Sequence, residues 1–179
     1  MIVHWEGHDI QTWDAVHANA AAALQQDGAY GSSLAVLGVP VLRARVVRDG
    51  VQICQAQFIV RKWWNIGAMA LCTRGPVWSV ALSPQEEADV YRAIKKSLPL
   101  TGIRFMAITP EVPYGQAHGL SSMRRIMSGM STVMLDITPS LEDLRSQLDR
   151  RWRHRLVGGE GSEMTIHRVG TNAGQYRWL

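Results

Sequence analysis

The sequence lacks any apolar run that approaches the roughly 18 residues needed to cross a bilayer, which argues against a membrane-spanning protein. Its N-terminus lacks the basic region and apolar stretch of a secretory signal peptide. The only two cysteines, Cys54 and Cys72, lie far apart and form no CxxC pair, so we expect buried, reduced thiols. Together these absences predict a cytoplasmic protein.

Recognisable catalytic and metal-binding patterns are also missing. The six histidines are scattered and show no zinc-ligand spacing. The sequence contains no Gly-x-Ser-x-Gly nucleophile elbow, no Walker loop and no dinucleotide-binding fingerprint. These patterns therefore identify no catalytic residue and predict no metal.

The sequence does contain enough apolar material for one domain, together with a modest excess of basic residues. The chain has 179 residues, of which 46% are hydrophobic and 19% are charged, and its net charge is +4. A positive net charge favours anionic partners such as RNA or phosphates. The densest basic cluster lies at 150–155, where four arginines accompany His154.

Apolar spacing and turn residues predict helices around a mostly antiparallel sheet, an α/β (α+β) fold in a single domain over 1–179. Valine-rich segments at 41–47 and 51–60, joined by Asp49-Gly50, predict a hairpin that 68–73 extends into a meander. The other predicted strands are 102–108, which we expect to be buried, 132–137 and 163–169. Helices are predicted at 9–23, 30–37, 83–98, 120–127 and 140–156, and a further helix begins at 172–179.

Two segments carry candidate functional residues. In Thr73-Arg74-Gly75-Pro76-Val77-Trp78, Gly-Pro predicts a turn, which Arg74 and Trp78 clamp by stacking unless they serve a ligand. The helix predicted at 140–156 has an apolar stripe that includes Trp152, expected in the core, and its arginines mostly fall away from that stripe. Guanidinium groups bind phosphate by paired hydrogen bonds, so this face either binds an anionic ligand or is an ordinary solvated face.

The pair Trp63-Trp64 lies at a predicted hairpin end. There the two rings either pack in the core or at an interface, or stay exposed. An exposed pair would stack on a base or sugar, or meet a membrane surface.

Three patches together resemble a known family. The string Thr-Val-Met-Leu-Asp-Ile-Thr-Pro-Ser-Leu-Glu-Asp-Leu-Arg from Thr132, followed by Arg151-Trp152-Arg153-His154-Arg155-Leu156, is the first. The string around Arg74 is the second, and Gln26 with Ala29-Tyr30-Gly31 is the third. In this order and spacing they resemble the Fem (FemAB-like) family of peptidoglycan interpeptide-bridge aminoacyltransferases, and more closely their proteobacterial relatives.

The resemblance implies an N-acetyltransferase (GNAT) fold with splayed central strands, present as the N-terminal half of a two-copy protein. Such proteins move an amino acid from aminoacyl-tRNA to an amine of a peptidoglycan precursor and need no other cofactor. Partners would be these substrates and a missing second half or a second copy of the chain. Basic residues hold the precursor pyrophosphate, and the matching positions here are Arg153, Arg151 and Arg150. The resemblance places Gln26, Tyr30, Arg74 and Trp78 at a substrate cleft.

The chain departs from the family pattern at two places, and two other functions remain open. Val157-Gly158-Gly159 stands where the family often has a basic pair and alanine, and Leu34 where it often has lysine. A CoA-dependent GNAT N-acyltransferase, with acetyl-CoA as donor, is one alternative, because 116–121 and 155–160 come near the loop that binds the CoA pyrophosphate. A non-catalytic phosphate or nucleic-acid binding module using 150–155 is the other.

Overall fold

The computed structural model describes residues 1–5, 9–63, 66–113, 115–129, 131–132 and 134–163. The chain divides into two compact units, Met1–Gly129 and Met130–Leu179, and each is described by itself. Among the described residues, no helix combines the length and the apolar composition required to span a membrane.

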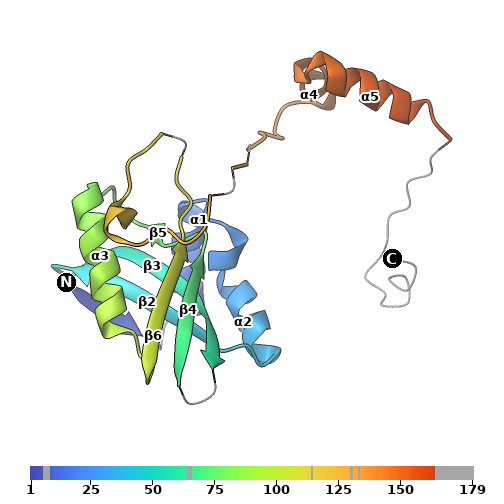
Figure 1. The fold of residues 1–179 in the computed structure, drawn as a ribbon. Helices are drawn as coiled ribbons and strands as arrows, with labels where there is room; N and C mark the ends of the chain where they lie inside the picture. The colour runs from blue at the N-terminus through green and yellow to red at the C-terminus, as the bar shows by residue number, and fades with distance from the viewer. Residues whose placement is uncertain (6–8, 64–65, 114, 130, 133, 164–179) are drawn as a thin grey trace. The chain divides into compact units, whose positions relative to one another are not determined.

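The first unit is built on one mixed sheet, shown in Figure 1. Its strands are β1 (Ile2–Trp5), β2 (Val41–Arg48), β3 (Val51–Trp63), β4 (Gly67–Thr73), β5 (Val77–Trp78) and β6 (Ile103–Thr109). The order is β1-β2-β3-β4-β6, and β5 pairs with β3. Every pairing is antiparallel except that of β4 with β6, which is parallel. The mixed, mostly antiparallel α+β fold predicted from the sequence is therefore confirmed.

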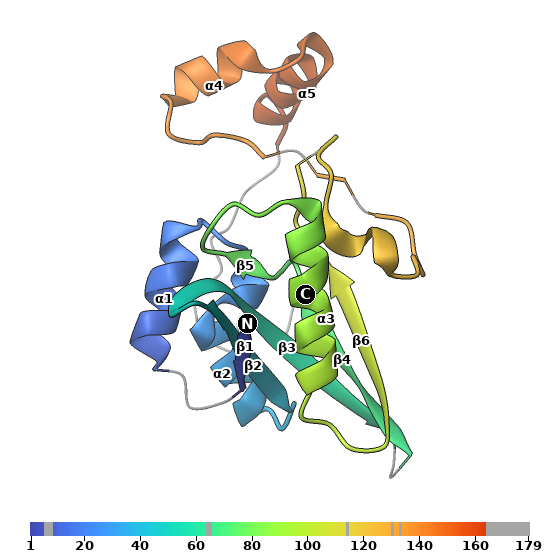
Figure 2. The same ribbon diagram turned by 90° about the vertical axis from the view of Figure 1, so that its left-hand side faces the viewer.

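Helices cover both faces of this sheet (Figure 2). They are α1 (Ile10–Asn19), η1 (Leu24–Gln26), α2 (Gly28–Val36), α3 (Pro84–Ser97) and the 3₁₀ turn η2 (Gly119–Ser122). The helix α3 packs on the apolar face, and α1, η1 and α2 lie on the other. The apolar core consists of Ala44, Val46, Ile53, Cys54, Ala56, Phe58, Ala70, Cys72, Val90, Ile94 and Leu98.

Local sequence signals account for the first hairpin and for the state of the cysteines. Asp49 and Gly50 have φ values of 50° and 79°, the two positive values that a two-residue type I′ turn requires.

Cys54 and Cys72 are free and buried, as predicted. Burial raises the pKa of the Cys72 thiol to about 12 and that of Cys54 beyond its usual range, so both thiols stay protonated and unreactive.

A capping box starts α3, as the sequence predicts. The Ser83 hydroxyl accepts from the backbone N–H of Glu86, and the Glu86 carboxylate accepts from the backbone N–H of Ser83 at 2.9 Å. Arg48 on β2 donates to the same carboxylate at 2.8 Å, so the box also ties α3 to the sheet. The Ser83 backbone N–H, then Arg48 and the Ser83 hydroxyl, lower the pKa of Glu86 to about 2.

This lowered pKa predicts an acid-sensitive contribution to stability. Because the folded state favours the ionised carboxylate, the contribution is fully present above the ordinary pKa of 4.5 and is lost as the pH falls from there towards 2. We expect the melting temperature of Glu86→Gln to lie below that of the wild type at neutral pH and to converge with it only as the pH falls to about 2. Thermal unfolding followed by circular dichroism over this range checks it. A difference that stays constant with pH would contradict the assignment.

In the first unit, two predicted elements differ from the structure and one strand was not predicted. The strand β6 is not buried: Ile103 and Phe105 are exposed. Instead of a helix at 120–127, the chain forms only η2. The strand β1 was missed, because its four residues are too few to show a clear pattern. The expected splay is also not found, since β4 and β6 stay paired from Gly67–Ile103 to Thr73–Thr109.

The second unit differs more from the sequence prediction. The predicted helix 140–156 is two helices, α4 (Leu141–Gln147) and α5 (Arg150–Glu160), because Asp149 caps a new helix by accepting from the Arg151 N–H. Gly158 and Gly159 lie inside α5 and do not end it. The described residues of 132–137 form no strand. Except for Glu163, the segments 163–169 and 172–179 lie outside the described residues.

Candidate functional site

The carboxyl ends of β4 and β6 bring two polar loops together. Arg74 follows β4 with a φ of 52°, a left-handed conformation that is uncommon for a residue other than glycine. Its backbone N–H donates to the Thr109 hydroxyl at the end of β6 at 3.2 Å, and its guanidinium forms an ion pair with Glu111. The Arg74 side chain is 39% exposed. Ligands commonly bind beyond the carboxyl ends of parallel strands, so Arg74 stands where a ligand could reach it.

Gln26 holds the loop that contains Arg74 in place. It is fully buried, its Oε1 accepts from the Gln57 N–H on β3 at 2.8 Å, and its Nε2 donates to the Thr73 carbonyl at 2.8 Å and to the Gln57 carbonyl at 3.2 Å. A Cβ on Gly75 would lie 2.6 Å from the Gln26 side chain, so this position requires glycine. Gln26 therefore fixes the course of the chain on both sides of Arg74 and has its amide engaged by the protein.

The other two predicted cleft residues contact different groups of the protein. Trp78 is half-buried and its ring meets that of Tyr91 on α3, with centroids 5.8 Å apart. Tyr30 lies in the first turn of α2, half-buried, where its backbone N–H donates to the capping Asp27 at 3.1 Å. Of the four predicted residues, the structure thus brings together Gln26 and Arg74.

A buried polar layer beside Gln26 was missed in the sequence. Gln55 and Gln57 point from β3 towards α1 and η1, where Gln55 donates to the Trp13 carbonyl at 2.9 Å and Gln57 donates to the Asp27 carbonyl at 2.9 Å. Arg43 on β2 donates to the Gln57 side chain at 2.7 Å and to the Gly28 carbonyl at 2.8 Å. Glutamines at alternate positions of a strand were the signal for this layer, because alternate residues share a face.

In the second unit, the arginines of α5 have different environments. Arg153 donates to the Ser146 carbonyl at 2.6 Å and to the Leu148 carbonyl at 2.9 Å, so its guanidinium caps the C-terminus of α4. Arg145 on α4 forms an ion pair with Glu160 at the end of α5. These contacts hold the two helices together and engage Arg153 internally.

Two other arginines of α5 line a hollow together with an exposed tryptophan. Asp149, Arg151, Trp152 and Arg155 line a hollow of about 320 Å³. The Arg155 guanidinium lies over the Trp152 ring, 5.8 Å from its centroid. Trp152 is 64% exposed, so its predicted place in the core is not found, and Arg150 is exposed beside it. This hollow offers two guanidinium groups and one aromatic face to a ligand.

The two segments whose sequences resemble a CoA-binding loop do not offer free backbone amides at the start of a helix. The Gly119 N–H donates to the Glu87 carboxylate at 2.6 Å, and a Cβ on Gly119 would lie 2.5 Å from the Ala88 nitrogen. Residues 155–160 form the C-terminal end of α5, where a helix favours cations and not phosphates. Across the described residues, no group of three or more His, Cys, Asp or Glu side chains could hold a metal.

Comparison with known proteins identifies the fold. No family model matches the chain, and no curated protein matches it. Among solved structures, the chain is similar to FemX, with 17% identity and a TM-score of 0.60 over 93% of this chain and 46% of FemX. It is also similar to a probable acetyltransferase, with 10% identity and a TM-score of 0.46 over 78% of this chain and all of that one. The chain thus has the fold of a part of FemX and spans 46% of its length.

Proposed function

We propose that this chain, which shares its fold with a part of FemX, is a Fem-like aminoacyltransferase domain. It would transfer an amino acid from aminoacyl-tRNA to an amine of a peptidoglycan precursor in the cytoplasm, as half of a two-copy enzyme. The single observation that carries the proposal is the FemX-like fold over 93% of the chain. The motifs around Gln26, Arg74 and Trp152, in the order that resembles the Fem family, support it.

The proposed reaction needs positioning more than side-chain chemistry. The acceptor amine attacks the ester carbonyl of aminoacyl-tRNA, a carbon–nitrogen bond forms, and the carbon–oxygen ester bond breaks. The amine loses its proton to solvent, and the ribose oxygen takes up a proton from solvent and leaves as a hydroxyl. Holding both substrates in line and stabilising the developing oxyanion contribute most of the acceleration in such a transfer.

Phosphate binding is proposed for the residues around the α5 hollow. Arg151 and Arg155 reach that hollow, and Arg150 is exposed next to them. Arg153 binds helix carbonyls, so we assign it the role of holding α4 and α5 together while its neighbours contact the precursor pyrophosphate. Arg74 is the cleft residue that we propose to contact substrate, because its side chain is partly exposed. Gln26 positions Arg74, and Tyr30 and Trp78 keep a place in the cleft as part of the proposal.

Calorimetry with a pyrophosphate-bearing wall precursor tests the assignment. We expect Arg151→Ala to weaken binding about ten-fold or more, because charge-assisted hydrogen bonds contribute about 1.5–3 kcal/mol. Arg92→Ala is the matched control, since Arg92 is an exposed arginine of the first unit that pairs with Asp89. Unchanged binding by Arg151→Ala would remove the hollow as the phosphate site.

The donor is tested separately. Transfer of a labelled amino acid from aminoacyl-tRNA to the precursor supports the proposal directly. Micromolar binding of acetyl-CoA without any affinity for the precursor would favour the CoA-dependent alternative. Binding of tRNA that falls steeply with salt and is not accompanied by precursor binding would favour a nucleic-acid binding module.

A further inference from the structure

One end of the sheet gathers exposed apolar side chains from three separate elements. At this end β3 turns into β4, β6 begins and α2 ends (Figures 1 and 2). We call it the hairpin end and define its apolar part as Val36, Leu37, Trp63, Ile66, Ile103 and Phe105. All six are exposed, Trp63 by 47%, Phe105 by 54% and Ile66 by 61%. Large apolar side chains that cluster on a surface usually mark a binding face.

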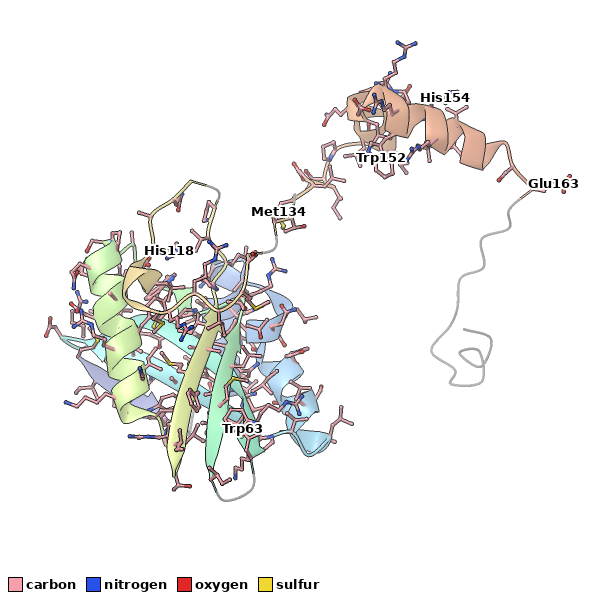
Figure 3. All side chains as sticks on the ribbon, in the orientation of Figure 1. Trp63, His118, Met134, Trp152, His154 and Glu163 are labelled. Carbon is pink, nitrogen blue, oxygen red and sulfur yellow. The ribbon has the colours of Figure 1, made fainter. Side chains whose placement is uncertain are left out.

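The register of the strands explains why Trp63, Ile103 and Phe105 lie close together. Trp63 on β3 pairs with Gly67 on β4, which pairs in turn with Ile103 on β6. Because Gly67 has no side chain, the Trp63 ring can reach across β4 to Phe105, and the two rings meet edge to face with centroids 5.9 Å apart. The Ile66 carbonyl accepts from the Ile103 N–H at 3.0 Å, which joins the turn to the start of β6. Trp63 lies at this end of the unit in Figure 3.

Among the described residues of β3, β4, β6 and the C-terminal part of α3, the charges at the hairpin end are all positive. The sequence contains no aspartate or glutamate from 50 to 85 or from 90 to 110, which covers β3, β4, the C-terminal part of α3 and β6. The cations here are Arg61, Lys62, Lys95, Lys96 and Arg104, and each is exposed. The acidic residues of the same elements lie at their other ends, as Glu86 and Glu87 in the first turn of α3 and Glu111 after β6.

We propose that the hairpin end binds the surface of an anionic lipid bilayer. Tryptophan and phenylalanine suit the boundary between headgroups and acyl chains, and arginine and lysine beside them attract anionic headgroups. The aliphatic side chains of Ile66, Ile103 and Leu37 offer no stacking face to a nucleic-acid base, and their chemistry matches acyl chains. Trp63 and Phe105 enter the headgroup region, while Arg61 and Lys62 contact lipid phosphates. Membrane binding by the hairpin end is separate from the acyl transfer reaction. The site around Arg74 lies at the opposite end of β4.

Flotation of the full chain with vesicles tests the proposal. The probes are vesicles of phosphatidylcholine alone and vesicles with about 30 mole per cent phosphatidylglycerol. We expect binding to the anionic vesicles only. The double variant Arg61→Glu with Lys62→Glu should weaken it about 25-fold or more, because each cation at an anionic surface contributes about five-fold. Trp63→Ala should weaken it about ten-fold.

Matched variants distinguish this end from the other basic parts of the chain. Arg124→Glu with Arg125→Glu changes an adjacent, exposed pair elsewhere in the first unit and should bind as the wild type does. Ile126→Ala removes an exposed apolar side chain elsewhere in the first unit and should also bind normally. Thermal unfolding of each variant shows that it is folded. The proposal would be overturned by equal binding to neutral and anionic vesicles, or by no binding to either kind of vesicle. It would also be overturned if vesicle binding were lost only in the double variant Arg150→Glu with Arg151→Glu.

Discussion

Replacing Gln26 with leucine is expected to lower the free energy of unfolding by about 3 kcal/mol, because it leaves several buried groups without partners. The Gln57 N–H loses its acceptor, and the Thr73 and Gln57 carbonyls lose their donor. Each such orphaned group costs about 1–3 kcal/mol, which the added apolar contact of leucine offsets in part. Urea denaturation measures the change.

Two further variants show whether hydrogen bonding is the cause. Gln85→Leu alters an exposed glutamine in the first turn of α3 and should change stability by less than about 0.5 kcal/mol. Gln26→Glu keeps the shape of the side chain but removes the donor. Because burial raises the pKa of such a carboxyl above about 4.3, the stability of the variant relative to that of the wild type should be highest at low pH and decline as the pH rises. A Gln26→Leu variant as stable as the wild type would contradict the role assigned to Gln26.

The second large effect is expected from Phe58→Ala, at about 4 kcal/mol of lost stability. Phe58 has no exposed surface, lies in the middle of β3 on the core face, and packs on Trp5 with ring centroids 5.7 Å apart. Truncation removes the transfer free energy of the ring and leaves a cavity that the close-packed sheet cannot fill by small shifts. Denaturant unfolding with an unchanged slope would attribute the loss to the native core.

Phe105→Ala is the internal control, because the chain has only two phenylalanines. Phe105 is 54% exposed at the hairpin end, so its loss should cost about 1 kcal/mol or less. Comparable losses at the two positions would mean that Phe105 is buried in solution, by a partner or by other parts of the protein.

The features that the sequence predicted well depend on residues close together in the chain. The Asp49-Gly50 turn and the Ser83–Glu86 capping box each use residues within four positions of one another, so their patterns are visible without the fold. The parallel pairing of β4 with β6 was not visible, because the strands are separated by β5 and α3.

The candidate site was harder to predict, since its geometry depends on distant partners. Gln26 was placed in a substrate cleft by motif resemblance, but its partners Gln57 and Thr73 lie 31 and 47 positions away and bury it. The resemblance named Arg153 first among the phosphate-binding arginines of α5, but the break at Asp149 places the α4 carbonyls within its reach. A strand was predicted at 132–137, but a strand also needs a hydrogen-bonding neighbour, which the local sequence alone cannot reveal.

The glutamine layer has a consequence for how faithfully this chain folds. A purely apolar interface between β3 and the helices packed on it would allow β3 to shift along the helices, because apolar contacts are not directional. The hydrogen bonds of the glutamine amides oppose such sliding. A shift of β3 by one residue would turn Gln55 and Gln57 to the opposite side of the sheet and leave their hydrogen-bond partners unpaired. Misaligned pairings of β3 are thereby penalised far more than a hydrocarbon contact would allow, and the chain is steered towards a single alignment.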